Sequence, residues 1–253
     1  MYKSEHGDEE KHFSDLEIEE LDTLFANFVK QSSFALIIII LLLYIISPKF
    51  FDRLQYEDGY VENLTVIFLL IALTGLLKYI FSKFDRKNIK NFHYSFIILQ
   101  ILGFFLVSLY ACLQELEFGQ RALDYEISEE TKDITKGNGM NLHHRQGMEN
   151  FLAFGAIIFS FYTAIIPHIL REPYSNRLPS KIKKSLSPLI LKIPRSLVPA
   201  FLTGIFLALL QEMSFLFTEE LEEFNEYSEV CFAYALALLG IYLWKATKNE
   251  GQI

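Results

Sequence analysis

Residues 93–118 of the chain, HYSFIILQILGFFLVSLYACLQELEF, decide its fold class. The segment is apolar over most of its length and ends in polar side chains around Gln114 and Glu115. An apolar run of about 18 or more residues is long enough to cross the hydrocarbon core of a bilayer as one α-helix. Because an ionisable side chain near the end of such a helix is costly to insert, Glu115 indicates a functional site.

The chain as a whole is 51% hydrophobic and 15% aromatic, and it contains further runs of this kind. Together they predict an all-α polytopic membrane protein with six transmembrane helices and no sizeable soluble domain. We expect residues 1–28 to form an acidic cytoplasmic tail with an amphipathic helix, and residues 29–253 to form the six-helix membrane domain. The predicted spans are 29–47, 61–82, 93–116, 149–170, 195–217 and 226–246.

Lysines and arginines predict the orientation of these spans. They gather in the connections between spans two and three and between spans four and five, and the connection between spans five and six has none. By the positive-inside rule the two basic connections are cytoplasmic, so both termini are cytoplasmic too. The acidic connections 48–60, 117–148 and 217–228 then lie on the extracytoplasmic face, and the net charge of −8 is divided between a basic inner and an acidic outer side.

The Gln-Glu pair at residues 114–115 occurs again at residues 211–212, also at the end of an apolar run. Both pairs are expected at helix C-termini, where the helix dipole disfavours a negative charge. Helix capping therefore does not explain Glu115 and Glu212. A bound cation, a protonated carboxyl group or an arginine partner would explain them.

A Glu-Asn pair begins spans two and four in the same way, at residues 62–63 and 149–150. Spans two–three and four–five therefore resemble two copies of one helix hairpin, both running in the same direction. This arrangement predicts a pseudo-two-fold axis along the membrane normal, as in parallel transporter repeats. Around such an axis the four glutamates of the two hairpins would meet at one level near the outer surface.

Glutamates from four facing helices are typical of metal sites in helix bundles. Oxygen ligands suit Mg, Ca or Mn, and a histidine would admit Zn or Fe, so we predict a divalent metal ion of undetermined identity. Of the adjacent histidines His143 and His144 we expect one to take part. The predicted metal ligands are Glu62, Glu115, Glu149, Glu212 and His143.

Charge balance offers an alternative without a metal. Arg121 could pair with Glu115, and Arg145 with Glu149, as a buried ion-pair network. The acidic run that ends at Glu229 is interpreted as a solvated rim that attracts cations, with Glu229 itself favoured by its place at a helix N-terminus.

Other motifs contribute less. Cys112 and Cys231 lie near the outer ends of their helices, where either a disulfide or two small buried side chains would fit. The chain has no Cys-x-x-Cys motif, no glycine-rich phosphate loop and no serine nucleophile elbow. Its acidic balance gives no support to nucleic-acid binding.

Three phrases carry a family resemblance: EDGYVE at residues 57–62, QELEFGQR at 114–121 and NLHH at 141–144. They resemble a family of uncharacterised multi-pass bacterial membrane proteins whose signature is Glu-Asp-Gly-x-x-Glu, then Glu-Glu-Ile-Ser-Trp-Gly-Gln-Arg, then Asn-Leu-His-Asn. The chain departs from it by having Gln114 for the first Glu, Glu117 for Ser, Phe118 for Trp and His144 for the last Asn.

The resemblance covers spans two to four and implies an inner-membrane polytopic protein, without an established chemistry. It favours Glu115, Gln120, Arg121, Asn141 and His143 and weakens Gln114 and His144. Of these, we predict Glu115, Arg121 and His143 as the catalytic residues. The expected supporting residues are Glu57, Asp58, Gln120, Asn141 and Gln211.

Three functions remain open from the sequence. The first is a membrane enzyme of hydrolase type, in which a metal or a carboxylate–histidine pair activates water on a lipid or lipid-linked substrate at the outer face. The second is a cation or proton channel or transporter, with Glu115 and Glu212 as the relay. The third is a non-catalytic membrane partner whose long outer loop docks another protein. The oligomeric state stays open.

Overall fold

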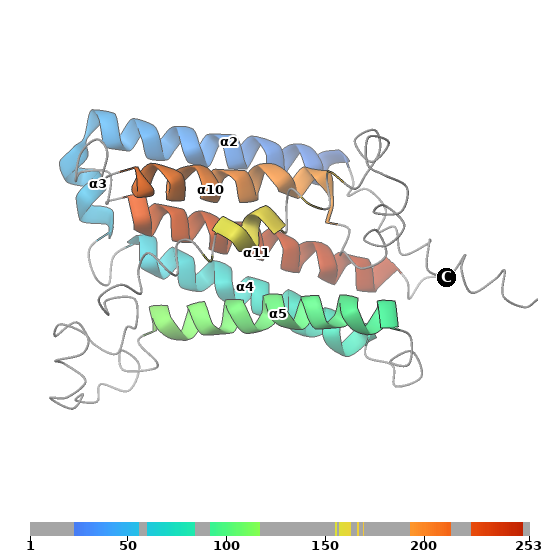
Figure 1. Ribbon diagram of the computed structural model, residues 1–253. Helices are drawn as coiled ribbons and strands as arrows, with labels where there is room; N and C mark the ends of the chain where they lie inside the picture. Colours follow the sequence, from blue (N-terminus) through green and yellow to red (C-terminus); the bar gives the residue numbers. More distant parts are fainter. Residues whose placement is uncertain are drawn as a thin grey trace, which may run out of the picture.

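The computed structural model describes part of the chain as a row of helices (Figure 1). The described residues are 23–55, 60–83, 92–116, 193–213 and 224–249, together with 155, 157–162, 166 and 169. Over these ranges the backbone contains no strand, which confirms the all-α prediction for that part of the molecule. The elements are α2 (Thr23–Ile46), α3 (Pro48–Gln55), α4 (Tyr60–Lys83), α5 (Phe92–Glu115), the 3₁₀ turn η6 (Arg195–Leu197), α10 (Val198–Glu212) and α11 (Phe224–Asn249).

Four of the described helices, α2, α4, α5 and α11, are long and apolar enough to cross a membrane. They correspond to predicted spans one, two, three and six. The fifth predicted span appears as the shorter apolar helix Arg195–Gln211. Helix α10 itself is 15 residues long, about 22 Å at 1.5 Å per residue, against roughly 30 Å for a hydrocarbon core. Predicted span four lies mostly outside the described residues.

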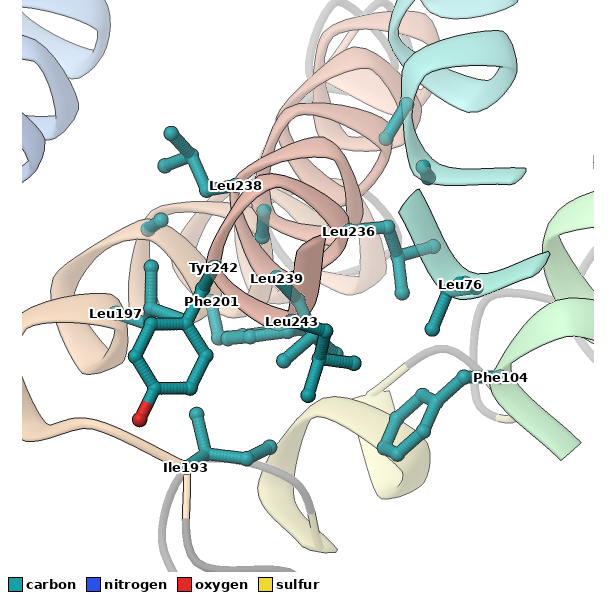
Figure 2. Packing of buried hydrophobic residues seen from close by; sticks show 14 of the residues in the cluster. Leu76, Phe104, Ile193, Leu197, Phe201, Leu236, Leu238, Leu239, Tyr242 and Leu243 are labelled. Carbon is teal, nitrogen blue, oxygen red and sulfur yellow. The ribbon is translucent and has the colours of Figure 1, made fainter. Parts of the chain in front are cut away.

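The helices lie side by side in the order α2, α10, α11, α4, α5 (Figure 1), and each neighbouring pair is in contact. Helix α11 is the most buried of the four long helices. Figure 2 shows its leucines, including Leu236 and Leu243, packed between Leu76 of α4 and Phe201 of α10. Because α11 is enclosed by other helices, side chains on several of its faces point towards protein.

Small residues bring α4 and α11 into close contact. A Cβ atom placed on Gly75 of α4 would overlap the backbone of Gly240 of α11, and one on Gly240 would lie 2.9 Å from Cα of Ala72. In a bilayer, where water does not drive helices together, such small residues allow the backbone approach and van der Waals contact that hold two helices together. This crossing fixes α4 against α11 below the cavity described in the next subsection.

Charged side chains separate towards the two ends of the row. Lys78 near the end of α4 lies over the ring of Trp244 near the end of α11, with Nζ 4.7 Å from the ring centroid. At the same end Lys245 of α11 lies 4.6 Å from the ring of Phe25, near the start of α2. The opposite end carries the carboxylates of the first turns of α4 and α11. The long described helices are therefore basic at one end and acidic at the other, and the short helix that follows α2 adds Lys49, Asp52 and Arg53 at the acidic end.

Helix α3 is a short amphipathic helix at the acidic end. Ser47 separates it from α2, and Pro48 at its first position cannot continue the hydrogen bonding of the preceding helix. The ring of its buried Phe51 stacks on Tyr227 of α11, with centroids 4.2 Å apart. The hydroxyl of Tyr227 donates a hydrogen bond to the carbonyl oxygen of Phe51 at 2.7 Å. This contact ties the α2–α3 corner to the helix that carries the site.

We expect Tyr227→Phe to lower the free energy of unfolding by about 1 kcal/mol, because it leaves a buried carbonyl without this donor. Thermal unfolding of the purified protein in detergent measures the change. Tyr60→Phe is the control, since Tyr60 is 81% exposed and should tolerate the loss of its hydroxyl. Equal loss of stability in both variants would contradict a specific role for the Tyr227 hydrogen bond.

Candidate functional site

A cavity of about 530 Å³ lies between α4, α5 and α11 and is completed by Phe201 of α10 and by part of the segment around residues 155–160. Its volume is in the range of small-molecule sites, about 300–1,000 Å³. Most of the wall is apolar, and the polar side chains come mainly from the acidic end of the helices. The described lining residues are Thr65, Leu69, Leu106, Val107, Tyr110, Ala111, Gln114, Glu115, Gly155, Phe159, Ser160, Phe201, Asn225, Ser228, Glu229, Phe232, Ala233 and Leu236.

Two carboxyl groups meet at the polar end of this cavity. Glu115, the last residue of α5, is only 7% exposed. Its side chain lies within hydrogen-bonding reach of that of Glu229 on α11. The Nδ2 atom of Asn225 donates a hydrogen bond to Oε1 of Glu229 at 3.2 Å. Glu62, in the first turn of α4, is near enough to act electrostatically on Glu229.

A hydrogen bond between two carboxyl groups has a chemical requirement. An ionised carboxylate has only acceptor oxygens, so one member of the Glu115–Glu229 pair must carry a proton to donate. If both are ionised, a cation must lie between them to offset their repulsion. The arrangement can therefore hold and release one proton, or hold one positive charge, at the edge of an apolar cavity.

The cavity extends from the carboxyl pair into the apolar part of the helix row. Its deeper wall includes Leu106 on α5 and Leu236 on α11. At about 1.5 Å per helical residue these lie roughly 10–14 Å from Glu115 and Glu229 along the helix axes. That distance is close to the depth of one leaflet of a hydrocarbon core that is about 30 Å thick. One end of the cavity is thus polar and acidic, and the other is apolar.

The α11 side of the cavity is one stripe of that helix. The stripe repeats every three or four residues and changes from polar to apolar along its length. In order, its members are Asn225, Ser228, Glu229, Phe232, Ala233 and Leu236. The sequence interpretation of Glu229 as part of a solvated rim missed its role as the partner of Glu115. The periodicity of this stripe was the signal that could have identified it.

The predicted site residues divide into three groups. Glu115 lines the polar end of the cavity beside Glu229, and Glu62 does not line the cavity but acts electrostatically on Glu229. Gln211 lies on α10 and does not line the cavity, and its buried Oε1 has no hydrogen-bond partner in the described part of the chain. Glu212 ends α10, but its side chain is outside the described set. Also outside that set are Glu57, Asp58, Gln120, Arg121, Asn141, His143 and Glu149.

The metal site stays a prediction, whereas the structure describes both cysteines. Among the residues whose positions are given, no group of three or more His, Cys, Asp or Glu side chains could hold a metal ion. The predicted metal site draws on Glu149, Glu212 and His143, so it stays a prediction. Cys112 and Cys231 are both buried and free. They are the small buried side chains that the sequence left as one alternative.

The chain was also compared with known proteins. No protein-family model matches it, and the comparisons with curated proteins and with solved structures likewise found no match. The chemistry of the site therefore rests on the side chains described above.

Proposed function

We propose that this membrane protein binds a lipid or lipid-linked molecule in the cavity and hydrolyses it with the carboxyl pair Glu115–Glu229. The observation that carries this proposal is the close pair of carboxyl groups at the polar end of a ligand-sized, mostly apolar cavity. A lipid-like molecule matches both ends of that cavity. Its chain would lie among the apolar side chains of α5 and α11, and its head group would reach the carboxyl pair.

The chemistry needs one acid and one base, and a pair that shares one proton supplies both. The ionised carboxylate takes a proton from water as the water oxygen bonds to the carbonyl carbon of an ester or amide. The protonated carboxyl then gives its proton to the leaving oxygen or nitrogen as the bond to the carbonyl carbon breaks. The Asn225 amide would hold Glu229 in position during both steps.

A divalent metal remains our proposed alternative to the shared proton. It would be held by Glu115 and Glu62 with Glu149, Glu212 and His143, and Arg121 would offset charge at the head group. A metal and a proton are two ways of compensating the same close carboxylates. When bound, the metal would lower the pKa of a water molecule and so supply the nucleophile.

We also propose that the acidic end faces the outside of the cell membrane and that both termini are cytoplasmic. The separation of charge along the described helices supports this orientation, with Lys78 and Lys245 at one end and Glu62 and Glu229 at the other. In this orientation the site would be reached from the outer leaflet.

The proposal predicts that Glu115→Gln and Glu229→Gln each lower hydrolysis by about 10²–10⁴-fold, the usual contribution of general acid–base catalysis. The assay incubates the purified protein with membrane lipid extract and follows the loss of substrate and the gain of product by mass spectrometry. The same preparation is analysed for bound metal. Glu226→Gln is the matched control, because it removes the same charge from the first turn of α11 without altering the cavity lining.

No turnover by the wild type would count against the enzyme proposal. Turnover that survives both glutamine variants would show that another group is the catalyst. Metal bound to the wild type and lost in Glu115→Gln would favour the metal over the shared proton.

A polar stripe along α5 supports proton or cation relay as the second candidate function. Below Glu115, this helix carries the buried Ser108, and further down it carries Gln100, whose Oε1 accepts a hydrogen bond from Tyr162 at 2.9 Å. These side chains could pass a proton through the membrane from the carboxyl pair. Proton flux in liposomes, lost in Glu115→Gln, would favour this function over hydrolysis.

A further inference from the structure

The charge of the cavity wall restricts the head group that it can hold. Its charged side chains in the described lining are Glu115 and Glu229, and the other polar ones are neutral hydroxyls and amides. Within that lining no lysine, arginine or histidine is present to bind a phosphate or a carboxylate. Beside Glu115 and Glu229, an anionic head group would meet like charge without a compensating cation from the described lining, which costs several kcal/mol in buried interfaces.

A second polar group lies in the deeper wall of the cavity. Ser160 lines it, is 1% exposed, and its Oγ has no hydrogen-bond partner among the described residues. Several hydroxyl groups on the described helices bond to the carbonyl one turn back, as Thr65 does to Val61 at 3.0 Å. Ser108 on α5 is also without a partner in the described part of the chain, but of the two serines only Ser160 lines the cavity. A buried hydroxyl without a partner is unfavourable, so Ser160 points to a polar atom of a ligand or a water in the cavity.

The depth of Ser160 follows from its neighbours. The ring of Phe159 lies 4.8 Å from that of Phe104 on α5, and Tyr162 bonds to Gln100 on the same helix. The segment around Ser160 therefore runs alongside α5 well below Glu115, roughly 15 Å at 1.5 Å per residue. The cavity thus has a negatively charged end and a neutral polar point near its other end.

We infer that the cavity takes an amphiphile with a primary ammonium head group and a second, neutral hydrogen-bonding group partway along its chain. An ammonium group has one positive charge and three donors. It can donate to the ionised member of the Glu115–Glu229 pair while the other member keeps its proton, so that the acid and the base of the proposed hydrolysis are both retained. The neutral group of the chain would bond to the Ser160 hydroxyl. The inference rests on the proposed function only in requiring that a lipid-like molecule occupies the cavity.

The experiment uses the full chain in phosphatidylcholine nanodiscs and four photoreactive probes, each with an alkyl chain and a diazirine near its end. Three of them carry a hydroxyl about 15 Å from the head group, to match the helical distance between Glu115 and the level of Ser160, and their head group is an amine, a phosphate or an alcohol. The fourth is an amine probe without the hydroxyl. We expect the amine probe to label the cavity segments around Phe201 and Leu236 at least about tenfold more than the phosphate probe, in line with the cost of juxtaposing like charges. Peptide mass spectrometry locates the label.

Variants separate the head-group contact from general binding. Glu115→Gln and Glu229→Gln should each reduce labelling by the amine probe several-fold, and Glu226→Gln should not. Ser160→Ala should reduce labelling by the amine probe that carries the hydroxyl. Labelling by the amine probe that lacks the hydroxyl should stay the same in this variant. Ala111→Trp, which fills part of the cavity, gives the background for all probes.

The outcomes distinguish this inference from the proposed function. Equal or stronger labelling by the phosphate or alcohol probe would overturn the ammonium head group and leave a lipid-binding cavity. Labelling by the amine that does not respond to either glutamine variant would overturn it as well. If every probe labels the cavity segments no more than the Ala111→Trp background, both the head-group inference and the lipid-binding proposal are wrong.

Discussion

Gly75→Ala on α4 should destabilise the membrane domain much more than Gly103→Ala on α5, although both add a single methyl group. The new Cβ would overlap the carbonyl of Gly240, and a backbone cannot move aside as a flexible side chain can. Overpacking of a well-packed contact costs about 1–3 kcal/mol, and contact with backbone belongs at the upper end of that range or above it. We expect a large drop in the thermal unfolding temperature in detergent and a smaller yield of monodisperse protein.

Gly103→Ala on α5 is the matched control for this substitution. Nothing lies within 4 Å of a Cβ placed there. Since alanine is less flexible than glycine in the unfolded chain, this variant should be unchanged or more stable by about 0.5–1 kcal/mol. Similar unfolding temperatures for Gly75→Ala and wild type would mean that α4 and α11 do not cross as closely as described.

The second large effect concerns the carboxyl pair. Replacing both Glu115 and Glu229 with leucine should abolish lipid hydrolysis and amine binding while leaving the protein as stable as the wild type or more stable. Apolar residues of similar volume often replace a buried polar or ionic pair without loss of stability. The Glu115→Leu single variant, in contrast, leaves Glu229 without this partner and should cost about 1–3 kcal/mol.

Thermal unfolding of the two single variants and the double variant gives a double-mutant cycle for the pair. We expect each single variant to lose stability and the double variant to be at least as stable as the wild type. Such a result would mean that the two side chains interact and that the pair is retained for function at a cost in stability. A double variant that loses stability by the full sum of the single effects would mean that the two side chains do not interact, and would contradict the pair.

Long apolar runs made three of the helices predictable from the sequence. The predicted spans 61–82, 93–116 and 226–246 correspond closely to α4, α5 and α11. The bilayer is the reason for this agreement, because a spanning segment must satisfy its own backbone hydrogen bonds and must reach a fixed length. The prediction needed no knowledge of which helix contacts which.

Helix α3 and Glu229 were beyond this kind of reasoning. Residues 48–55 are too short and too polar to be read as a span, and their helix depends on the packing of Phe51 against Tyr227. Glu229 was interpreted as solvated because it follows other glutamates. Its pairing with Glu115 depends on the contact of α11 with α4 and α5, which local sequence does not specify.

The enclosed position of α11 has a consequence for biosynthesis. Its mean hydropathy as a candidate span is 1.5, against 2.3 to 2.4 for α2, α4 and α5. A helix with a weaker apolar signal enters the bilayer less readily by itself. Helix α11 is also synthesised after α4 and α10, the helices that cover it. Helices α4 and α10 would therefore be at the translocon or in the lipid before α11 is made, with the surfaces that later contact α11 still exposed. Helix α11 would then complete the domain by inserting against these surfaces.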